Sequence, residues 1–198
     1  MTVIVSIVEG DGEVTALPIL LRRIGAWLSP EMQVEVKLPI RVKRDRFLNR
    51  EEEFKRMLEL AALKCDQDGW ILVLLDADDE CPVELGGRVS ERARNIIPHR
   101  SISVVLANRE YEAWFIAAAG SLNGCRGFTF NGINQHESEA IRGAKEWMGA
   151  HMPNGKYREV ADQPAFSASM DLQLALDNSR SFRKLCNEWS RNMVPGGE

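Results

Sequence analysis

Four short apolar runs, each separated from the next by a longer stretch of mixed character, dominate the first 120 residues of the chain. They cover residues 3–8, 34–38, 70–75 and 102–106 and are rich in Val, Ile and Leu. Runs that are apolar throughout are typical of strands buried on both faces of a parallel sheet. The second run alternates apolar and charged residues, which also predicts a strand.

The stretches between these runs repeat their apolar residues at helical spacing, which predicts helices. We expect Asp11 to cap the first helix and Pro82 to begin the third. Strands and helices in alternation predict an α/β fold with a mainly parallel sheet of about four strands and helices on both faces. The expected helices cover residues 13–28, 50–64, 82–97 and 108–119.

Beyond residue 120 the pattern is less regular. We expect an α/β core over residues 1–120 and a C-terminal extension over residues 121–198, which packs on the core so that the chain forms one compact unit. Within the extension the pattern predicts a Gly- and Asn-rich loop over 121–135, a helix near 137–149, a polar loop over 153–164 and helices over 169–193.

The composition is that of a soluble globular protein with a sizeable core, since 44% of its 198 residues are hydrophobic and 27% are charged. A net charge of −4 argues against a basic surface over the whole protein, although local basic patches remain able to bind nucleic acid. The four cysteines form no C-x-x-C pair, which disfavours a zinc site and a redox motif. With no apolar segment of about 20 residues and no leader-like start, we expect a cytoplasmic protein without membrane contact.

Acidic residues follow three of the predicted strands. Because the carboxyl ends of parallel strands lie at one edge of a sheet, we expect these side chains to converge there. Carboxylates crowded in a partly dry cleft repel one another until they are protonated or a cation neutralises them. An all-oxygen ligand set selects Mg²⁺, Mn²⁺ or Ca²⁺ over zinc. The acids are Glu9 and Glu13 at the first strand, Asp76, Asp78 and Asp79 at the third, and Glu110 and Glu112 at the fourth.

Asp76 and Asp78 stand at alternate positions, so in extended backbone both carboxylates point to the same side and can face one ion. We also expect the carboxylate of Glu9 to lie close to this pair. An alternative interpretation is that acids at strand-to-helix junctions cap the next helix and favour its positive end. That alternative accounts well for any single acid and less well for the whole set.

Several of these segments resemble known proteins. A strand that ends in Glu9-Gly10, with Glu13 to follow, and a strand that ends in Asp76-Ala77-Asp78 resemble the toprim domain of topoisomerases, bacterial primases and overcoming-lysogenization-defect nucleases. More narrowly, the chain from Val3 to about Leu185 resembles an uncharacterised bacterial toprim-like family, domain of unknown function 4276. The segments that carry this likeness are V-E-G-D-G-E-V-T-A-L-P-I-L-L-R-R-I, L-L-D-A-D-D, N-R-E-Y-E-A-W-F, D-Q-P and S-F-R-K-L.

The resemblance implies a toprim-like, Rossmann-like fold and a nuclease or related phosphoryl-transfer enzyme that uses Mg²⁺ or Mn²⁺. By family analogy such an enzyme acts in bacterial defence against phage or plasmids beside an ATPase, which would be a separate subunit because this chain has no P-loop. The alternative is a non-catalytic toprim-like adaptor that binds metal or a partner protein. The candidate catalytic residues are Glu9, Glu13, Asp76, Asp78 and Glu112, and the candidate metal ligands are Glu9, Asp76, Asp78 and Asp79.

Two basic segments complete the candidate site. The first follows the second predicted strand, where it is either a solvated face or, at the acidic edge, a group that neutralises the phosphates of DNA or RNA. The second lies in the polar loop and is suited to stabilising charge on a scissile phosphate. Trp114 and Phe115, in contrast, are expected to pack a helix on the sheet and not to stack on a base. The basic residues are Arg41, Lys43, Arg44, Arg46 and Arg50 in the first segment, and Lys156 and Arg158 in the second.

Overall fold

The structure is a computed structural model that describes residues 1–132 and 137–193. Within these residues five strands form one sheet in the order β2-β1-β4-β5, with the short β3 paired to β1, and every pairing is parallel. This confirms the predicted α/β fold. The strands are β1 (Thr2–Val8), β2 (Val34–Val36), β3 (Ile40–Arg41), β4 (Trp70–Asp76) and β5 (Ser101–Ala107).

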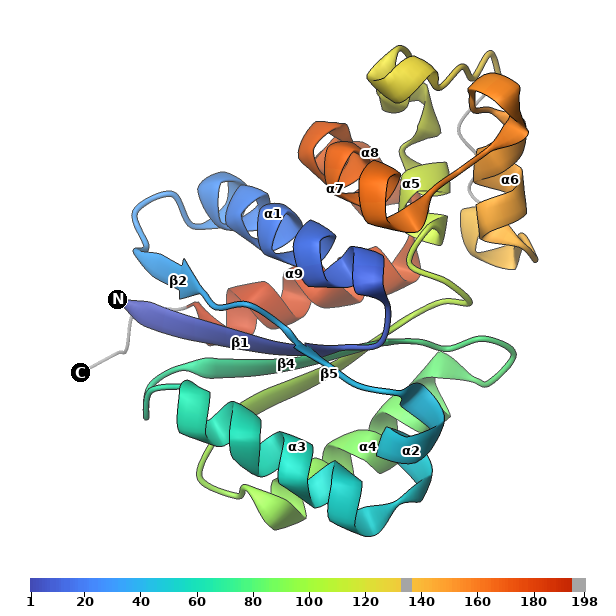
Figure 1. The fold of residues 1–198 in the computed structure, drawn as a ribbon. Coiled ribbons are helices and arrows are strands. Elements are labelled where there is room, and N and C mark those ends of the chain that lie inside the picture. Colours follow the sequence, from blue (N-terminus) through green and yellow to red (C-terminus); the bar gives the residue numbers. More distant parts are fainter. Residues whose placement is uncertain (133–136, 194–198) are drawn as a thin grey trace.

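Helices cover both faces of this sheet (Figure 1). One face carries α1, α7 and α9, and the other carries α2, α3 and α4. The α-helices are α1 (Asp11–Leu28), α2 (Arg44–Asn49), α3 (Glu51–Lys64), α4 (Pro82–Ile96), α5 (Ala113–Ala117), α6 (Ala144–Ala150), α7 (Glu159–Ser169), α8 (Leu172–Asn178) and α9 (Arg180–Asn192). Short 3-10 turns lie at Ala119–Leu122, Cys125–Gly127, Ser138–Ala140 and Pro153–Gly155.

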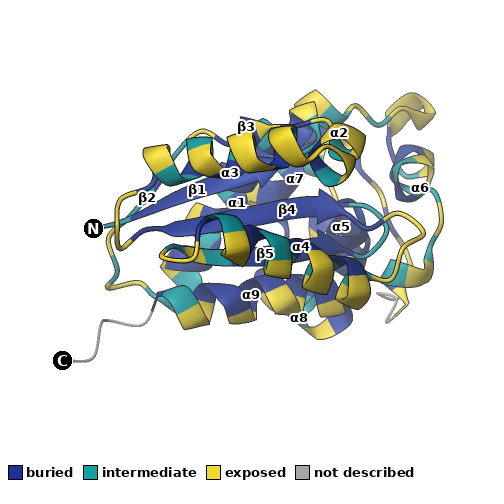
Figure 2. Cartoon of the chain, turned by 90° about the horizontal axis from the view of Figure 1, so that it is seen from below, coloured by how far each residue is buried: buried dark blue, intermediate teal, exposed yellow. Residues whose placement is uncertain are grey.

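The sheet separates two hydrophobic cores, because successive side chains of a strand point to opposite faces. In β1, Val3 and Val5 belong to the core beneath α3 and α4, whereas Ile4 and Val8 belong to the core beneath α1. Figure 2 shows the strands buried and the outer surfaces of α3 and α4 exposed. Burial of both faces explains why the sequences of β1 and β4 are mostly apolar.

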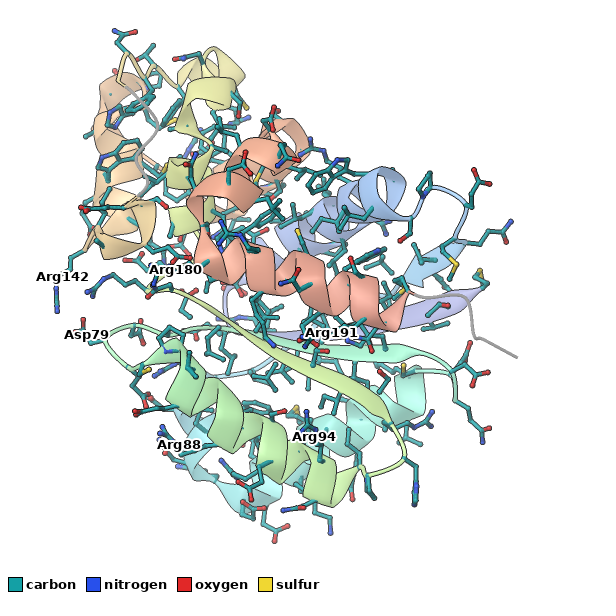
Figure 3. The ribbon with its side chains drawn as sticks, turned by 180° about the vertical axis from the view of Figure 1, so that it is seen from behind. Asp79, Arg88, Arg94, Arg142, Arg180 and Arg191 are labelled. Atoms are coloured by element: carbon teal, nitrogen blue, oxygen red, sulfur yellow. The ribbon has the colours of Figure 1, made fainter. Side chains whose placement is uncertain are left out.

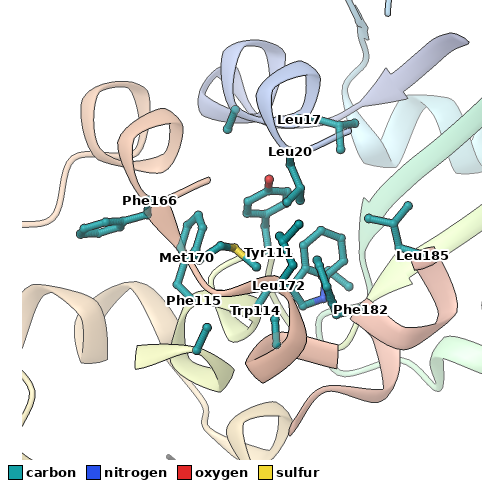
Figure 4. Close-up of a cluster of buried hydrophobic side chains, with 14 of the residues drawn as sticks. Leu17, Leu20, Tyr111, Trp114, Phe115, Phe166, Met170, Leu172, Phe182 and Leu185 are labelled. Atoms are coloured by element: carbon teal, nitrogen blue, oxygen red, sulfur yellow. The ribbon is translucent and has the colours of Figure 1, made fainter. Parts of the chain in front are cut away.

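The core beneath α1 is rich in aromatic side chains (Figure 4). Trp114 and Phe115 of α5 are fully buried in it, as predicted, and pack against Phe182 and Phe166 respectively with ring centroids 5.4 and 5.5 Å apart. Because Phe166 lies on α7 and Phe182 on α9, this cluster joins the C-terminal helices to the sheet. The site at the end of the sheet is therefore supported from a distant part of the chain.

Several predicted boundaries are wrong, each for a physical reason. Asp11 is the first residue of α1 and not its cap, which is Gly10. The predicted helix over 50–64 is preceded by a second helix, α2, because Arg50 adopts an extended conformation between α2 and α3. The predicted helix over 108–119 shrinks to α5, since the preceding residues form a turn whose Tyr111 N–H bonds to Asp76.

The predicted polar loop over 153–164 contains the start of α7. Its polar sequence and Pro164 both disfavour a helix, but Asp162 and Gln163 are buried and α7 packs along α1. Tertiary contacts therefore override local preference here. The predicted loop over 121–135 and the extension over 121–198 include residues 133–136 and 194–198, which lie outside the described residues.

No helix among the described residues is both long enough and apolar enough to cross a membrane.

We expect alanine at two helical glycines, Gly87 and Gly12, to change the stability of the protein in opposite directions. At Gly87, in α4, an added Cβ meets nothing within 4 Å, so Gly87→Ala should raise the free energy of unfolding by about 0.5–1 kcal/mol. At Gly12, in α1, an added Cβ collides with the Gln163 side chain, so Gly12→Ala should lower it by roughly 1–3 kcal/mol. Urea denaturation of both variants checks this, and a stabilising Gly12→Ala would contradict the close packing of α1 and α7.

Candidate functional site

Four carboxyl groups lie together where β1 and β4 end, and they form what we call the acidic cluster: Glu9, Glu13, Asp76 and Glu112. Their side chains are close enough to raise one another's pKa. Glu13, Asp76 and Glu112 are buried, with 3%, 8% and 0% of their surface exposed, and Glu9 is half-buried. The parallel sheet explains the convergence, because β1 and β4 are neighbours whose carboxyl ends lie at the same end of the sheet.

Local hydrogen bonds hold two of these carboxylates. The Glu13 side chain, one turn into α1, turns back so that its Oε2 accepts bonds from the backbone N–H groups of Glu9 and Gly10, both at 3.3 Å. The Oδ1 of Asp76 accepts the Tyr111 N–H at 2.9 Å, which ties the end of β4 to the turn after β5. The capping interpretation is thus partly realised, at Glu13, within the same cluster.

Glu112 is held by residues from the C-terminal part of the chain. Its Oε1 accepts bonds from the Tyr157 hydroxyl at 3.0 Å and from Gln163 Nε2 at 2.7 Å. Gly12 lets α7 come close, since any side chain there would occupy the position of Gln163. The Oε2 atoms of Glu112 and Glu9 are buried without a hydrogen-bond partner among the described residues, an arrangement that leaves acceptors open toward a ligand.

Burial shifts the ionisation of the whole cluster toward the neutral form. Burial, together with the charges of Glu13 and Glu112, raises the pKa of Asp76 well above its usual range. Burial raises the pKa of Glu13 to about 7 and also raises the pKa values of Glu9 and Glu112. The cluster therefore carries excess negative charge at neutral pH unless protons or a cation compensate it.

One cation faces this cluster that the sequence analysis did not identify. Lys145, at the start of α6, pairs with Glu159 at 3.2 Å and is half-buried. Although burial opposes it, the neighbouring Glu112 and Glu159 carboxylates raise the pKa of Lys145, so it stays protonated. In the sequence Lys145 is one lysine among many, since α6 and the cluster meet only in the folded chain.

The first basic segment lies partly beside the acidic cluster, at the carboxyl end of the sheet. Arg44 Nε donates to the backbone oxygen of Asp76 at 3.1 Å, and its guanidinium pairs with Asp78 at 3.3 Å and Glu80 at 2.8 Å. Arg41 Nε donates to the backbone oxygen of Glu9 at 3.1 Å. The exposed side chains of Lys43, Arg46 and Arg50, in the same segment, have no ion-pair partner among the described residues.

Asp78 and Asp79 do not lie where extended backbone would put them. β4 ends at Asp76, and Asp78 has a left-handed backbone (φ 51°), so the predicted alternation of Asp76 and Asp78 in a strand is wrong. The exposed Asp78 pairs with Arg44, and its charge contributes to the raised pKa of Glu9. Asp79 is exposed and pairs with Arg109 at 2.8 Å and Arg142 at 2.9 Å, away from the cluster (Figure 3).

Lys156 and Arg158 flank Tyr157, the residue that bonds to Glu112. Both are exposed, and both line a small pocket of about 240 Å³ beside Asp162. The second basic segment thus lies next to a residue of the site, while its own charged groups have no ion-pair partner among the described residues.

The acidic cluster fits a hard divalent cation by its chemistry, because every donor is a carboxylate oxygen and two of these oxygens, Oε2 of Glu9 and of Glu112, have no hydrogen-bond partner among the described residues, although Arg44 lies 4.0 Å from the first. The side chains are not arranged as a complete metal-binding site. Among the described residues no three His, Cys, Asp or Glu side chains lie close enough to hold a metal ion as they stand. Glu13 and Asp76 already accept backbone N–H groups, so coordination requires side chains to rotate.

The raised pKa values predict that the metal-free protein loses stability as pH rises. A carboxyl group with a raised folded-state pKa contributes stability below its unfolded pKa and loses it as pH rises through the folded value. For Glu13 this window runs from the ordinary pKa of 4.5 to about 7, which corresponds to up to about 3 kcal/mol. Asp79, Glu139 and Glu188, whose pKa values are lowered, act below this window.

Urea denaturation in EDTA from pH 5 to 8 measures this loss. Glu13→Gln should flatten the decline, because glutamine still accepts the backbone bonds but does not ionise. Glu84→Gln, on the exposed surface of α4, is the matched control and should leave the decline unchanged. A wild-type protein that becomes more stable across this range would contradict a buried acidic cluster.

The comparisons with known proteins agree with the segments noted in the sequence. A family model described as "Domain of unknown function (DUF4276)" matches residues 8–189. Neither the search of curated proteins nor that of solved structures gave a match. The matched span includes the whole acidic cluster, Lys145 and the residues of α7 that hold Glu112. This chain therefore belongs to the DUF4276 family.

Proposed function

We propose that this protein is a nuclease or related phosphoryl-transfer enzyme that acts on nucleic acid with Mg²⁺ or Mn²⁺. The observation that carries the proposal is the gathering of three buried carboxyl groups and the half-buried Glu9 at one end of a parallel sheet, with Lys145 and Arg44 beside them. Desolvation and repulsion make such a cluster unfavourable in a purely structural role. Perturbed carboxyl groups in this position are typical of functional sites.

Glu9, Asp76 and Glu112 are the residues that would hold the cation, with Asp78 at the outer edge. When bound, a divalent ion of this kind supplies Lewis-acid stabilisation of the charge that develops on a phosphoryl group. Glu13 has a pKa of about 7 and uses Oε2 for the backbone, so its Oε1 is suited to accept and release a proton near neutral pH. Asp79 does not enter this proposal, because it pairs with arginines on the outer rim.

Cations around the cluster support a phosphate-containing substrate. Lys145 and Arg44 stand at the edge of the acids, and Lys43 and Arg46 extend into solvent beside them. Such side chains neutralise a phosphate backbone without reading bases. Lys156 and Arg158 are a second candidate group, next to Tyr157, for charge on the scissile phosphate.

The toprim relationship is part of this proposal and rests on the segments that end in Glu9-Gly10 and Asp76-Ala77-Asp78. By the same analogy it would be an effector of defence against phage or plasmids with a separate ATPase subunit. A cytoplasmic location is also part of the proposal and rests on the sequence pattern alone. One observation favours the alternative of a non-catalytic adaptor: Glu13 and Asp76 already bond to backbone N–H groups, and no ready coordination group exists among the described residues.

The first test is the response to Mn²⁺. At pH 7.5 we expect Mn²⁺ to raise the melting temperature of the wild-type protein by mass action and to permit cleavage of a panel of plasmid, single-stranded DNA and RNA substrates. Asp76→Asn should lower Mn²⁺ affinity and cleavage at least about tenfold. In EDTA the variant should be at least as stable as wild type, because one acid of a mutually repelling cluster is removed and Oδ1 still accepts the Tyr111 N–H.

Asp79→Asn is the matched control, since Asp79 lies three residues from Asp76 and its carboxylate forms only exposed ion pairs, which are screened by solvent and contribute little to stability. It should keep both Mn²⁺ binding and cleavage. Binding of Mn²⁺ without cleavage of any substrate would favour the adaptor. The absence of an Mn²⁺ response in calorimetry would contradict the metal site itself.

The second test concerns the approach to the cluster. If Lys43 and Arg46 bind phosphates, the double variant Lys43→Ala/Arg46→Ala should weaken binding equally for all sequences and reduce the slope of log K against log salt by roughly 0.7–0.9 for each phosphate that is no longer neutralised. The control is Lys64→Ala/Arg94→Ala, which removes the same charge. Lys64 and Arg94 lie near the C-terminal ends of α3 and α4, which precede β4 and β5 and therefore lie at the amino end of the sheet. Titrations at several salt concentrations decide, and an equal effect of both double variants would remove this segment from substrate binding.

A further inference from the structure

The strand β5 is an edge of the sheet, with α4 and α9 packed against its two faces. Among the described residues it pairs with β4 alone, and its seven residues, Ser-Ile-Ser-Val-Val-Leu-Ala, include neither a charge nor a proline. Soluble proteins usually keep edge strands short, charged or interrupted, because free N–H and C=O groups pair with other chains. The opposite edge follows this rule, since β2 has three residues and carries Glu35 with Lys37 next to it.

A groove of about 700 Å³ runs along the free edge of β5 between α4 and α9. Figure 3 shows β5 crossing between these two helices, with Arg94 on the side of α4 and Arg180 and Arg191 near the two ends of α9. Side chains of Ile102, Val104 and Leu106 contribute to its lining. A strand edge that faces a groove is the geometry in which proteins add an extended peptide to a sheet.

The side of this groove that α4 provides is lined by small residues. Gly86, Gly87 and Ser90 line it, and Gly87 is exposed with open space where a Cβ would stand. Glycine is unfavourable inside a helix, and no contact in the described chain requires it at position 87. The missing side chains leave room for those of an added strand.

The wall that α9 provides is basic. Arg180, Lys184 and Arg191 line it, against two acids: Glu188, which pairs with Lys184 at 2.6 Å and Arg191 at 2.9 Å, and Glu139, which accepts bonds from Ser181 at the start of α9. Arg180 has no ion-pair partner among the described residues. The charges on α4 balance, since Glu91 and Arg94 both line that wall. The excess positive charge therefore lies on the α9 side.

We propose that this groove binds an extended segment of a partner protein, which adds to the sheet beside β5. Side chains of a strand alternate in direction, so the segment places acidic residues toward α9 and aliphatic residues toward Gly87. A second copy of this chain is the less suitable occupant, because symmetric pairing of two β5 edges would bring the same basic helix of each copy together. The proposal is independent of any catalytic activity at the acidic cluster.

Fluorescence anisotropy with the full chain tests this with three labelled peptides. The first, Glu-Val-Glu-Val-Glu-Val-Glu with blocked ends, should bind. A peptide with Lys in place of each Glu, and one with Pro in place of the central Val, should each bind at least about tenfold more weakly. Amide shifts of β5 residues in NMR spectra should accompany binding of the first peptide.

Variants of the groove provide the controls. Gly87→Trp fills the α4 wall and should weaken binding at least about tenfold, whereas Gly87→Ala should bind as wild type does. Arg180→Glu should weaken binding of the acidic peptide without touching the core. No binding of the acidic peptide up to about 1 mM, equal affinity for the Lys peptide, or full affinity in Gly87→Trp would overturn the proposal. A dimer in light scattering that Gly87→Trp converts to a monomer would assign the groove to a second copy instead.

Discussion

Desolvated negative charge at the carboxyl end of the sheet is the constraint around which this structure is arranged. Parallel pairing of β1 and β4 brings Glu9 and Asp76 to one edge, and Glu13 and Glu112 lie beside them. Four carboxyl groups in one partly dry volume are unfavourable unless protons, cations or hydrogen-bond donors compensate them. The fold supplies donors from three directions: backbone N–H groups at Glu9, Gly10 and Tyr111, the arginines of the first basic segment, and the C-terminal residues around Glu112.

This constraint makes the C-terminal part of the chain a component of the site. Tyr157 and Gln163 both bond to Glu112, and Lys145 supplies a protonated amine close to it. Their positions depend on α7 lying against α1, where Gly12 provides the space, and on the aromatic core that joins α5, α7 and α9. The predicted α/β core over residues 1–120 and the predicted extension over residues 121–198 therefore both contribute groups that contact Glu112.

The two ends and two edges of the sheet offer different surfaces. The carboxyl end gathers acids with cations around them, and we proposed a metal ion and a phosphate-containing substrate there. The β5 edge, bordered by the glycines of α4 and the cations of α9, pairs with β4 alone among the described residues, and we proposed an extended peptide there. Because the groove contains no residue of the acidic cluster, mutations can test the two proposals separately.

The sequence alone predicted the parallel α/β fold and an acidic carboxyl end of the sheet, because apolar runs and strand ends are local signals. Of the seven acids it placed there, Glu9, Glu13, Asp76 and Glu112 form the cluster. It also identified the DUF4276 family from segments that the family match spans. Only the tertiary structure decided that Asp78 leaves the strand direction, that Asp79 pairs with Arg109 and Arg142, and that a helix with an internal proline begins at Glu159. The roles of Lys145 and Gln163 also depended on it, since long-range packing brings these side chains to acids that lie far from them in the chain.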